Sequence, residues 1–211
     1  MKYSFIYILF LSIFTPLHAQ YMQTINCDNG LSNRRVFQIV KDKSHFMWFA
    51  TRAGFDRYDG KNIRHYTLPQ TKGSRIFGLA TSSDGDIWGF SSHGNLYHYD
   101  KDKDSYSLQL SLDSLLQTDE PFIFKIYVDT RNSIWICSSQ GLYCYFPQEK
   151  KLSAVTDLNG KTVYEINELE TGRYALFTGE GFYLLKVVDK PFKVNLQSVP
   201  DRGVAVSQVR T

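Results

Sequence analysis

The segment MWFATRAGFDRYDG, residues 47–60, decides the fold, because its pattern returns three more times along the chain. The later copies are IWGFSSHGNLYHYD (87–100), IWICSSQGLYCYF (134–146) and YALFTGEGFYLL (174–185). In each of the first three copies a Trp precedes a Gly by six residues, and in the fourth Ala175 stands at the Trp position. The repeat markers are Trp48 and Gly54, Trp88 and Gly94, Trp135 and Gly141, and Gly181. Their spacings of 40, 47 and 40 residues indicate a repeat architecture.

Each unit holds enough strand-forming sequence for a small sheet. A short apolar run lies upstream of each marker, at 36–40, 76–80, 123–128 and 163–169, and a polar turn separates the run from the marker. Tyrosine-rich and apolar runs after the marker supply a third and a fourth strand. About 40 residues for a four-stranded antiparallel meander is the period of a β-propeller blade.

We therefore predict an all-β fold of four four-stranded antiparallel blades, plus the start of a fifth, in an incomplete ring. The predicted blades cover about residues 27–70, 71–115, 116–158 and 159–200, and the next blade starts at 201–211. The marker glycines are expected to adopt positive φ in hairpin turns, and the tryptophans to pack between neighbouring blades.

Composition agrees with a folded β protein and disfavours nucleic-acid binding. The 211 residues are 43% hydrophobic and 15% aromatic, which is enough to build a core and favours pleated sheet. The 24 basic residues exceed the 21 acidic ones by only three, and no run of like charge forms a basic arm.

The first 19 residues are typical of a secretory signal peptide. Lys2 precedes an apolar run from Tyr3 to Phe14, and Leu17-His18-Ala19 forms a cleavage site. We expect cleavage after Ala19, so that residues 20–211 make up the exported, periplasmic part as a partial propeller sensor domain.

The residues that could carry covalent or metal chemistry follow no recognisable motif. Cys27, Cys137 and Cys144 do not have the spacing of a zinc site, and whether Cys137 and Cys144 form a disulfide stays open. No histidine lies in a nucleophile motif, and no glycine-rich loop could hold a phosphate. We expect no catalytic residue, no metal and no cofactor.

Residues 30–67, GLSNRRVFQIVKDKSHFMWFATRAGFDRYDGKNIRHYT, resemble the two-component regulator propeller repeat. This repeat occurs in the periplasmic sensor regions of Bacteroides-type hybrid two-component histidine kinases. The resemblance rests on the Gly-Leu-Ser-Asn lead, the strand that ends in Lys-Asp, and the Trp, Thr, Gly and Arg-Tyr-Asp-Gly that follow in the family order. Later units are looser, and the resemblance covers about residues 20–185.

The resemblance implies a sensor with two seven-bladed propellers, an immunoglobulin-like domain, one membrane helix, and kinase and response-regulator parts that end in a DNA-binding domain. Those parts are missing here, so we expect an amino-terminal fragment of such a receptor, with a short gene product as the other interpretation. Membrane attachment would come only through a missing downstream segment, and a homodimer would belong to the full-length receptor. No kinase activity is expected within these residues.

Loops at one rim of the blades are the predicted ligand face. In an antiparallel blade, the turns between second and third strands share a rim with the connections that lead into the next blade. Loops on a rigid scaffold commonly carry recognition, and arginines suit anionic or polyhydroxyl ligands such as oligosaccharides. The candidate ligand-binding residues are Arg34, Arg35, Arg52, Arg75, His93 and Gln140.

Two other functions fit the same fold. A secreted glycan-cleaving enzyme would need two converging carboxylates, one of them with a raised pKa. Glu120, Glu165, Glu168 and Glu180 are the available candidates, but they occupy unlike repeat positions. The third interpretation is a propeller that serves only as a platform for protein interactions.

Overall fold

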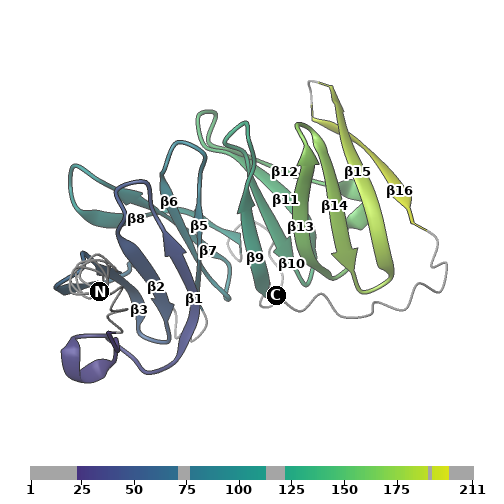
Figure 1. The fold of residues 1–211 in the computed structure, drawn as a ribbon. Helices are drawn as coiled ribbons and strands as arrows, with labels where there is room; N and C mark the ends of the chain where they lie inside the picture. Colours follow the sequence, from purple (N-terminus) through teal and green to yellow (C-terminus); the bar gives the residue numbers. More distant parts are fainter. Residues whose placement is uncertain (1–22, 71–76, 113–121, 190–191, 200–211) are drawn as a thin grey trace, which may run out of the picture.

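Four separate sheets make up the described part of the chain. The computed structural model describes residues 23–70, 77–112, 122–189 and 192–199. Each sheet has four strands that pair antiparallel in the order of the chain (Figure 1). The all-β fold of four-stranded antiparallel blades is confirmed, and we call the sheets blades 1 to 4. The predicted signal peptide and the start of the fifth blade lie outside the described residues.

The strand bounds are as follows. Blade 1 holds β1 (Val36–Lys41), β2 (Met47–Thr51), β3 (Gly54–Tyr58) and β4 (Ile63–Tyr66). Blade 2 holds β5 (Phe77–Thr81), β6 (Ile87–Ser91), β7 (Asn95–Asp100) and β8 (Ser105–Ser111). Blade 3 holds β9 (Ile123–Val128), β10 (Ile134–Ser138), β11 (Gly141–Phe146) and β12 (Lys151–Ala154). Blade 4 holds β13 (Val163–Glu170), β14 (Arg173–Thr178), β15 (Gly181–Asp189) and β16 (Lys193–Ser198). Two short 3₁₀ helices, η1 (Cys27–Asn29) and η2 (Thr156–Leu158), complete the described elements.

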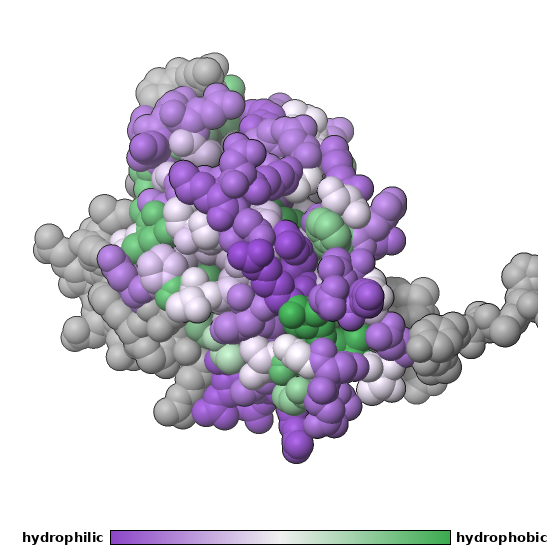
Figure 2. Space-filling model, turned by 90° about the vertical axis from the view of Figure 1, so that its left-hand side faces the viewer, coloured by the Kyte–Doolittle hydropathy of each residue, from purple (hydrophilic) through white to green (hydrophobic). Residues whose placement is uncertain are grey.

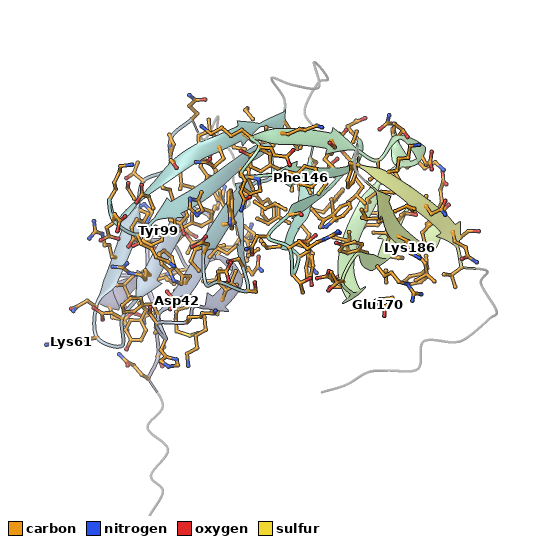
Figure 3. All side chains as sticks on the ribbon, turned by 90° about the horizontal axis from the view of Figure 1, so that it is seen from above. Asp42, Lys61, Tyr99, Phe146, Glu170 and Lys186 are labelled. Carbon is orange, nitrogen blue, oxygen red and sulfur yellow. The ribbon has the colours of Figure 1, made fainter. Side chains whose placement is uncertain are left out.

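The four blades fan out along an open arc. The first strands of successive blades contact one another, β1 with β5, β5 with β9 and β9 with β13, so they lie on the inside of the arc. Seen from above, the described blades follow a curve from Asp42 in blade 1 past Tyr99 and Phe146 to Lys186 in blade 4 (Figure 3). The described sheets therefore form part of a ring, as an incomplete propeller does.

Two kinds of hairpin turn repeat from blade to blade. Between the first and second strands, one residue adopts the left-handed conformation in each blade: His45, Gly85, Asn132 and Gly172. Between the second and third strands, the four marker glycines have φ from +98° to +141°. Side chains with a Cβ rarely adopt that conformation, which explains why Gly recurs at this position.

The tryptophans pack from one blade against the next. Trp48 of blade 1 lies 4.7 Å from Tyr99 and 6.1 Å from Tyr106 of blade 2, between ring centres. Trp135 of blade 3 lies 4.7 Å from Tyr174 of blade 4. Because Trp48 and Trp135 are fully buried, these contacts form the apolar layers between blades.

The cysteines are free, and two of them belong to the core between blades 3 and 4. Cys137 pairs across the hairpin with Leu142, and Cys144 pairs with Trp135, so the register does not place the two thiols opposite each other. Burial raises the pKa of both thiols far above the usual value, which keeps them protonated and unreactive. The disulfide that the sequence left open is therefore not formed.

Residues 23–35 are joined to blade 1 by hydrogen bonds to β3. The main-chain N–H and the hydroxyl of Ser32 both donate to Asp56, at 2.9 Å and 2.7 Å, and Leu31 is buried. The molecule viewed from the side of blade 1 is mostly hydrophilic, with small hydrophobic patches (Figure 2). None of the helices in the described ranges has the length and apolar character needed to cross a membrane.

Candidate functional site

The blades present two rims with different chemistry. We call the end that carries Gly54, Gly94, Gly141 and Gly181 the glycine rim, because these residues mark the turns between second and third strands. The first strand of each blade begins at this rim, since it pairs antiparallel with the second strand, which ends there. The opposite rim carries the turns between first and second strands.

Five of the six residues predicted to bind a ligand lie at the glycine rim. Arg34 and Arg35 directly precede β1, Arg52 lies in the turn after β2, and His93 and Gln140 lie in the equivalent turns of blades 2 and 3. The sixth, Arg75, lies outside the described residues.

The three arginines of blade 1 form an exposed cationic group. The main-chain N–H of Arg52 donates to the carbonyl of Arg35 at 3.0 Å, which joins the turn after β2 to the chain that enters β1. All three arginine side chains are exposed. Within the described residues their guanidinium groups have neither an ion-pair nor a hydrogen-bond partner, so they are available to an anion.

A repeated β-bulge adds aromatic side chains next to this rim. Strand pairing skips one residue near the start of the first strand in three blades, namely Phe37, Phe124 and Tyr164. A bulged residue leaves the ladder and its side chain is re-aimed. These three side chains are 38%, 37% and 40% exposed, whereas Ile123 and Val163, the paired residues directly before two of them, are buried.

Blade 2 shows what the bulge changes. Phe77 stands at the repeat position of Phe37 and Phe124, but it pairs directly with Ser91, without a bulge. As a result Phe77 is buried in the core between blades 1 and 2. One skipped residue therefore decides whether this aromatic ring packs inside or faces solvent.

These aromatic residues were not among the predicted site residues, although the sequence carries a signal for them. An aromatic residue stands eleven positions before every marker, at Phe37, Phe77, Phe124 and Tyr164. That regularity predicts a shared role, whereas the bulge that separates exposed rings from the buried one depends on register and is not visible in the repeat.

The exposed rings of blades 3 and 4 continue into a ladder. Successive ring centres lie 5.0 Å apart from Phe122 to Phe124, 5.1 Å to Tyr164, 5.5 Å to Phe177 and 5.0 Å to Phe182. We call these five residues the aromatic ladder. Its last member, Phe182, is 56% exposed. Such a row of exposed rings is larger than the single apolar residues common on protein surfaces.

Polar groups lie beside the ladder. Lys125 Nζ donates to Glu165 Oε1 at 2.5 Å, across the first strands of blades 3 and 4, and Asn167 donates to the same oxygen at 3.3 Å. The hydrogen bond from Lys125 lowers the pKa of Glu165. Residues next to the exposed rings thus offer both donors and acceptors.

The carboxylates considered for catalysis do not converge. Glu180 pairs with Lys161 at 2.8 Å at the glycine rim, and this contact lowers its pKa. Glu168 accepts hydrogen bonds from Thr130 towards the opposite rim. Glu120 lies outside the described residues. Within the described ranges, no group of His, Cys, Asp and Glu side chains has an arrangement that could hold a metal ion.

The comparisons with known proteins support the fold and give no close relative. No family model matches the sequence, and no curated protein does. Solved structures match with full probability, among them the extracellular domains of the hybrid two component systems BT3049 and BT4673 from B. thetaiotaomicron. The first is 22% identical with a TM-score of 0.62, and the second 19% identical with a TM-score of 0.65. The expected resemblance to the extracellular regions of such systems is confirmed at the level of the fold.

The chain corresponds to only part of those structures. The alignments cover 81% and 77% of this chain but 26% and 22% of the two extracellular domains. An enzyme shares the fold as well: virginiamycin B lyase from Staphylococcus aureus matches with a TM-score of 0.59 at 14% identity, over 78% of this chain and 56% of the lyase. Because all these identities are low, the comparisons establish the propeller fold and leave the function to be argued from the site.

Proposed function

We propose that the chain is the ligand-sensing propeller portion of an exported hybrid two-component sensor, and that it binds an oligosaccharide at the glycine rim. The similarity to extracellular domains of such systems supports the sensor assignment and a periplasmic location. In this proposal the signal passes to domains outside these residues, the membrane is crossed by one of them, and any homodimer belongs to the full-length receptor. The chain itself uses no cofactor and binds no nucleic acid.

The repeated bulge is the observation that carries this proposal. It exposes an aromatic side chain near the glycine rim in three blades, and in blade 1 that ring follows two exposed arginines in the chain. Sugar rings present apolar C–H faces that pack on aromatic rings, and hydroxyls that need hydrogen-bond partners. Guanidinium groups bind carboxylates and sulfates in a bidentate fork. The combination favours an anionic oligosaccharide over a neutral one.

Catalysis at these residues is disfavoured on chemical grounds. A glycoside hydrolase needs a carboxylic acid whose pKa is raised, so that it stays protonated and can donate to the leaving group. Hydrogen bonds from Lys125 and Lys161 instead lower the pKa of Glu165 and Glu180. We therefore propose binding without cleavage, and a glycan-cleaving enzyme remains the alternative that the experiment must exclude.

Titration calorimetry with a panel of acidic oligosaccharides and their neutral counterparts tests the proposal, together with an assay for new reducing ends. We expect an acidic member to bind, and we expect Arg52→Ala and Tyr164→Ala each to weaken binding about tenfold, the loss of one good contact. Arg173→Ala is the control, because Arg173 is exposed but begins β14 at the opposite rim, where it pairs with Glu170.

Three results would count against the proposal. Unchanged affinity of both Arg52→Ala and Tyr164→Ala would show that the ligand does not bind at the glycine rim. Release of reducing ends would favour the enzyme. Failure of every oligosaccharide to bind, with retention of a protein partner by the aromatic ladder, would favour an interaction platform.

A further inference from the structure

A cavity of about 850 Å³ opens at the opposite rim, among residues of blades 2, 3 and 4. Its lining includes Ser82, Asp84 and Trp88 of blade 2 and Arg131, Asn132 and Glu149 of blade 3. None of the residues predicted at the glycine rim lines it. Any function of this cavity is therefore separate from the function proposed above and does not depend on it.

A hydrogen bond that recurs in the scaffold is missing at this cavity. In blades 1 and 3 the turn between first and second strands begins with an Asp, and its Oδ2 accepts from the indole N–H six residues later. The distances are 2.8 Å for Asp42 and Trp48 and 3.0 Å for Asp129 and Trp135. We call this pair the Asp–Trp clamp.

Blade 2 keeps the Trp but has lost the Asp. Ser82 begins its turn, and the Ser82 hydroxyl accepts from the main-chain N–H of Asp86 at 2.9 Å, as Asp42 Oδ1 does from Phe46 in blade 1. Ser has no second oxygen to reach Trp88, whose indole N–H has no hydrogen-bond partner within the described residues. Blade 4 has neither clamp residue, since Leu169 and Ala175 occupy the two positions. Of the four described blades, blade 2 alone presents an unclamped indole.

An unpartnered acceptor lines the same cavity. Asn132 takes the left-handed conformation at φ 60° in the turn of blade 3, and its amide nitrogen donates to Asp84 Oδ2 at 2.5 Å. The amide oxygen of Asn132 is buried and has no hydrogen-bond partner. Buried polar atoms of this kind are rare, and each one calls for an explanation.

The two open groups define the chemistry of an occupant. Hydroxyl groups can both accept from an N–H such as that of Trp88 and donate to an oxygen such as that of Asn132, which neither a simple anion nor a simple cation can do. The charged groups of the lining nearly balance, since three carboxylates, Asp84, Asp86 and Glu149, face the cations of Arg131 and Lys151. Strong selection for a net charge is therefore absent.

Size and shape agree with this chemistry. The cavity volume lies within the range of about 300–1,000 Å³ that is common for small-molecule sites. Phe146 and Phe192 also line the cavity, and their ring centres lie 5.6 Å apart, so they form an apolar wall beside the polar groups. We infer that this cavity is a second binding site, for a neutral saccharide of about two or three sugar units.

The indole N–H signals provide a direct measurement. The chain has three Trp, and the signals of Trp48 and Trp135 belong to clamped, fully buried rings. We titrate the ¹⁵N-labelled chain with maltotriose, cellotriose, xylotriose and mannotriose and record nuclear magnetic resonance spectra. One of these sugars should shift the indole N–H signal of Trp88, while the signals of Trp48 and Trp135 stay in place.

Three variants test the assignment to this cavity. Trp88→Phe removes the N–H and keeps an aromatic ring, and Asn132→Gly removes the amide oxygen at a position where blades 2 and 4 carry glycine. Each should weaken binding about tenfold. Ser82→Asp should restore the Asp–Trp clamp, abolish binding, and move the Trp88 signal even without sugar. His45→Gly is the matched control, because His45 occupies the same turn position in blade 1.

The possible results separate cleanly. The proposal is wrong if none of the four trisaccharides moves the Trp88 signal, or if Asn132→Gly and Ser82→Asp both bind as tightly as the unchanged chain. A melting curve for each variant shows whether it is folded, and the control variant shows whether the turn alone matters. Loss of binding at the glycine rim, with binding here intact, would contradict only the proposed function.

Discussion

Replacing Asp129 with Ala should lower the free energy of unfolding by about 4 kcal/mol. Asp129 is 1% exposed, and its Oδ2 accepts from Trp135 in its own blade at 3.0 Å and from the Tyr174 hydroxyl of blade 4 at 2.7 Å. A hydrogen bond to a charged group contributes about 1.5–3 kcal/mol, so these two bonds together give this magnitude as a minimum, because Oδ1 also accepts from the main-chain N–H groups of Arg131 and Ser133. Burial, and after it the hydrogen bond to Asp129, raise the pKa of Tyr174, which keeps its hydroxyl a donor.

Asp42 is the matched comparison, because it forms the same clamp without a bond to the next blade. Its Oδ2 accepts from Trp48 alone. Asp42→Ala should therefore cost about 2 kcal/mol, one such bond. With a urea dependence of about 2 kcal/mol per molar, the midpoint of Asp129→Ala should lie about 1 M below that of Asp42→Ala.

A double-mutant cycle isolates the link between blades. Asp129→Ala and Tyr174→Phe remove the two ends of one hydrogen bond, so the combined variant should be more stable than the sum of the single losses indicates, by about 1–2 kcal/mol. Equal midpoints for Asp129→Ala and Asp42→Ala, or a coupling energy near zero, would show that the carboxylate does not hold blades 3 and 4 together.

Three further outcomes follow from the described contacts. Gly141→Ala should lower the free energy of unfolding by about 1–2 kcal/mol more than Gly181→Ala, as measured by thermal melts. Both positions have positive φ, but the new Cβ at 141 would lie 3.0 Å from a main-chain oxygen, whereas none of the described atoms lies within 4 Å at 181. Iodoacetamide should label half-buried Cys27 in the folded chain, while Cys137 and its buried neighbour should react only after unfolding, as read by mass spectrometry. The pKa of Glu165 is lowered on folding, so its ion pair with Lys125 stabilises the chain above the ordinary pKa of 4.5. This stabilisation should be lost as the pH falls through the lowered pKa. A difference in stability between the unchanged chain and Glu165→Gln that persists at the lowest pH would contradict this prediction.

The sequence predicted the scaffold well because the scaffold repeats. Trp48, Gly54 and their copies recur at fixed offsets. Each Trp packs its ring between blades, and each Gly supplies the positive φ of a hairpin turn. Averaging over four copies makes such a signal visible even without related sequences. Grouping loops by rim also placed Arg52, His93 and Gln140 together, because strand direction in a meander is fixed once the strands are counted.

The features that the sequence did not predict depend on single residues. A bulge shifts register by one position, and this separates exposed Phe124 from buried Phe77 although both are phenylalanine at the same repeat position. No composition or spacing distinguishes the two, because the shift depends on how the whole strand pairs. The cavity beside Trp88 similarly needs the relative positions of several blades, which the repeat does not contain.

Departures from the repeat are informative because the intact copies act as internal references. The clamp residues Asp129 and Trp135 occur together, as do their counterparts in blade 1, and blade 4 has neither residue. This is expected if each residue serves as the hydrogen-bond partner of the other. An indole kept without its carboxylate breaks that rule, and the Trp88 nitrogen is not among the described buried atoms that lack a partner, so it is open to the cavity that Trp88 lines. Packing alone does not require Trp88 to carry an N–H, because a Phe ring could also pack against Tyr145. A ligand that supplies the missing acceptor does explain the N–H of Trp88. Ser82→Asp is therefore the decisive substitution, because it restores the Asp–Trp clamp at the place where we propose that a ligand binds instead.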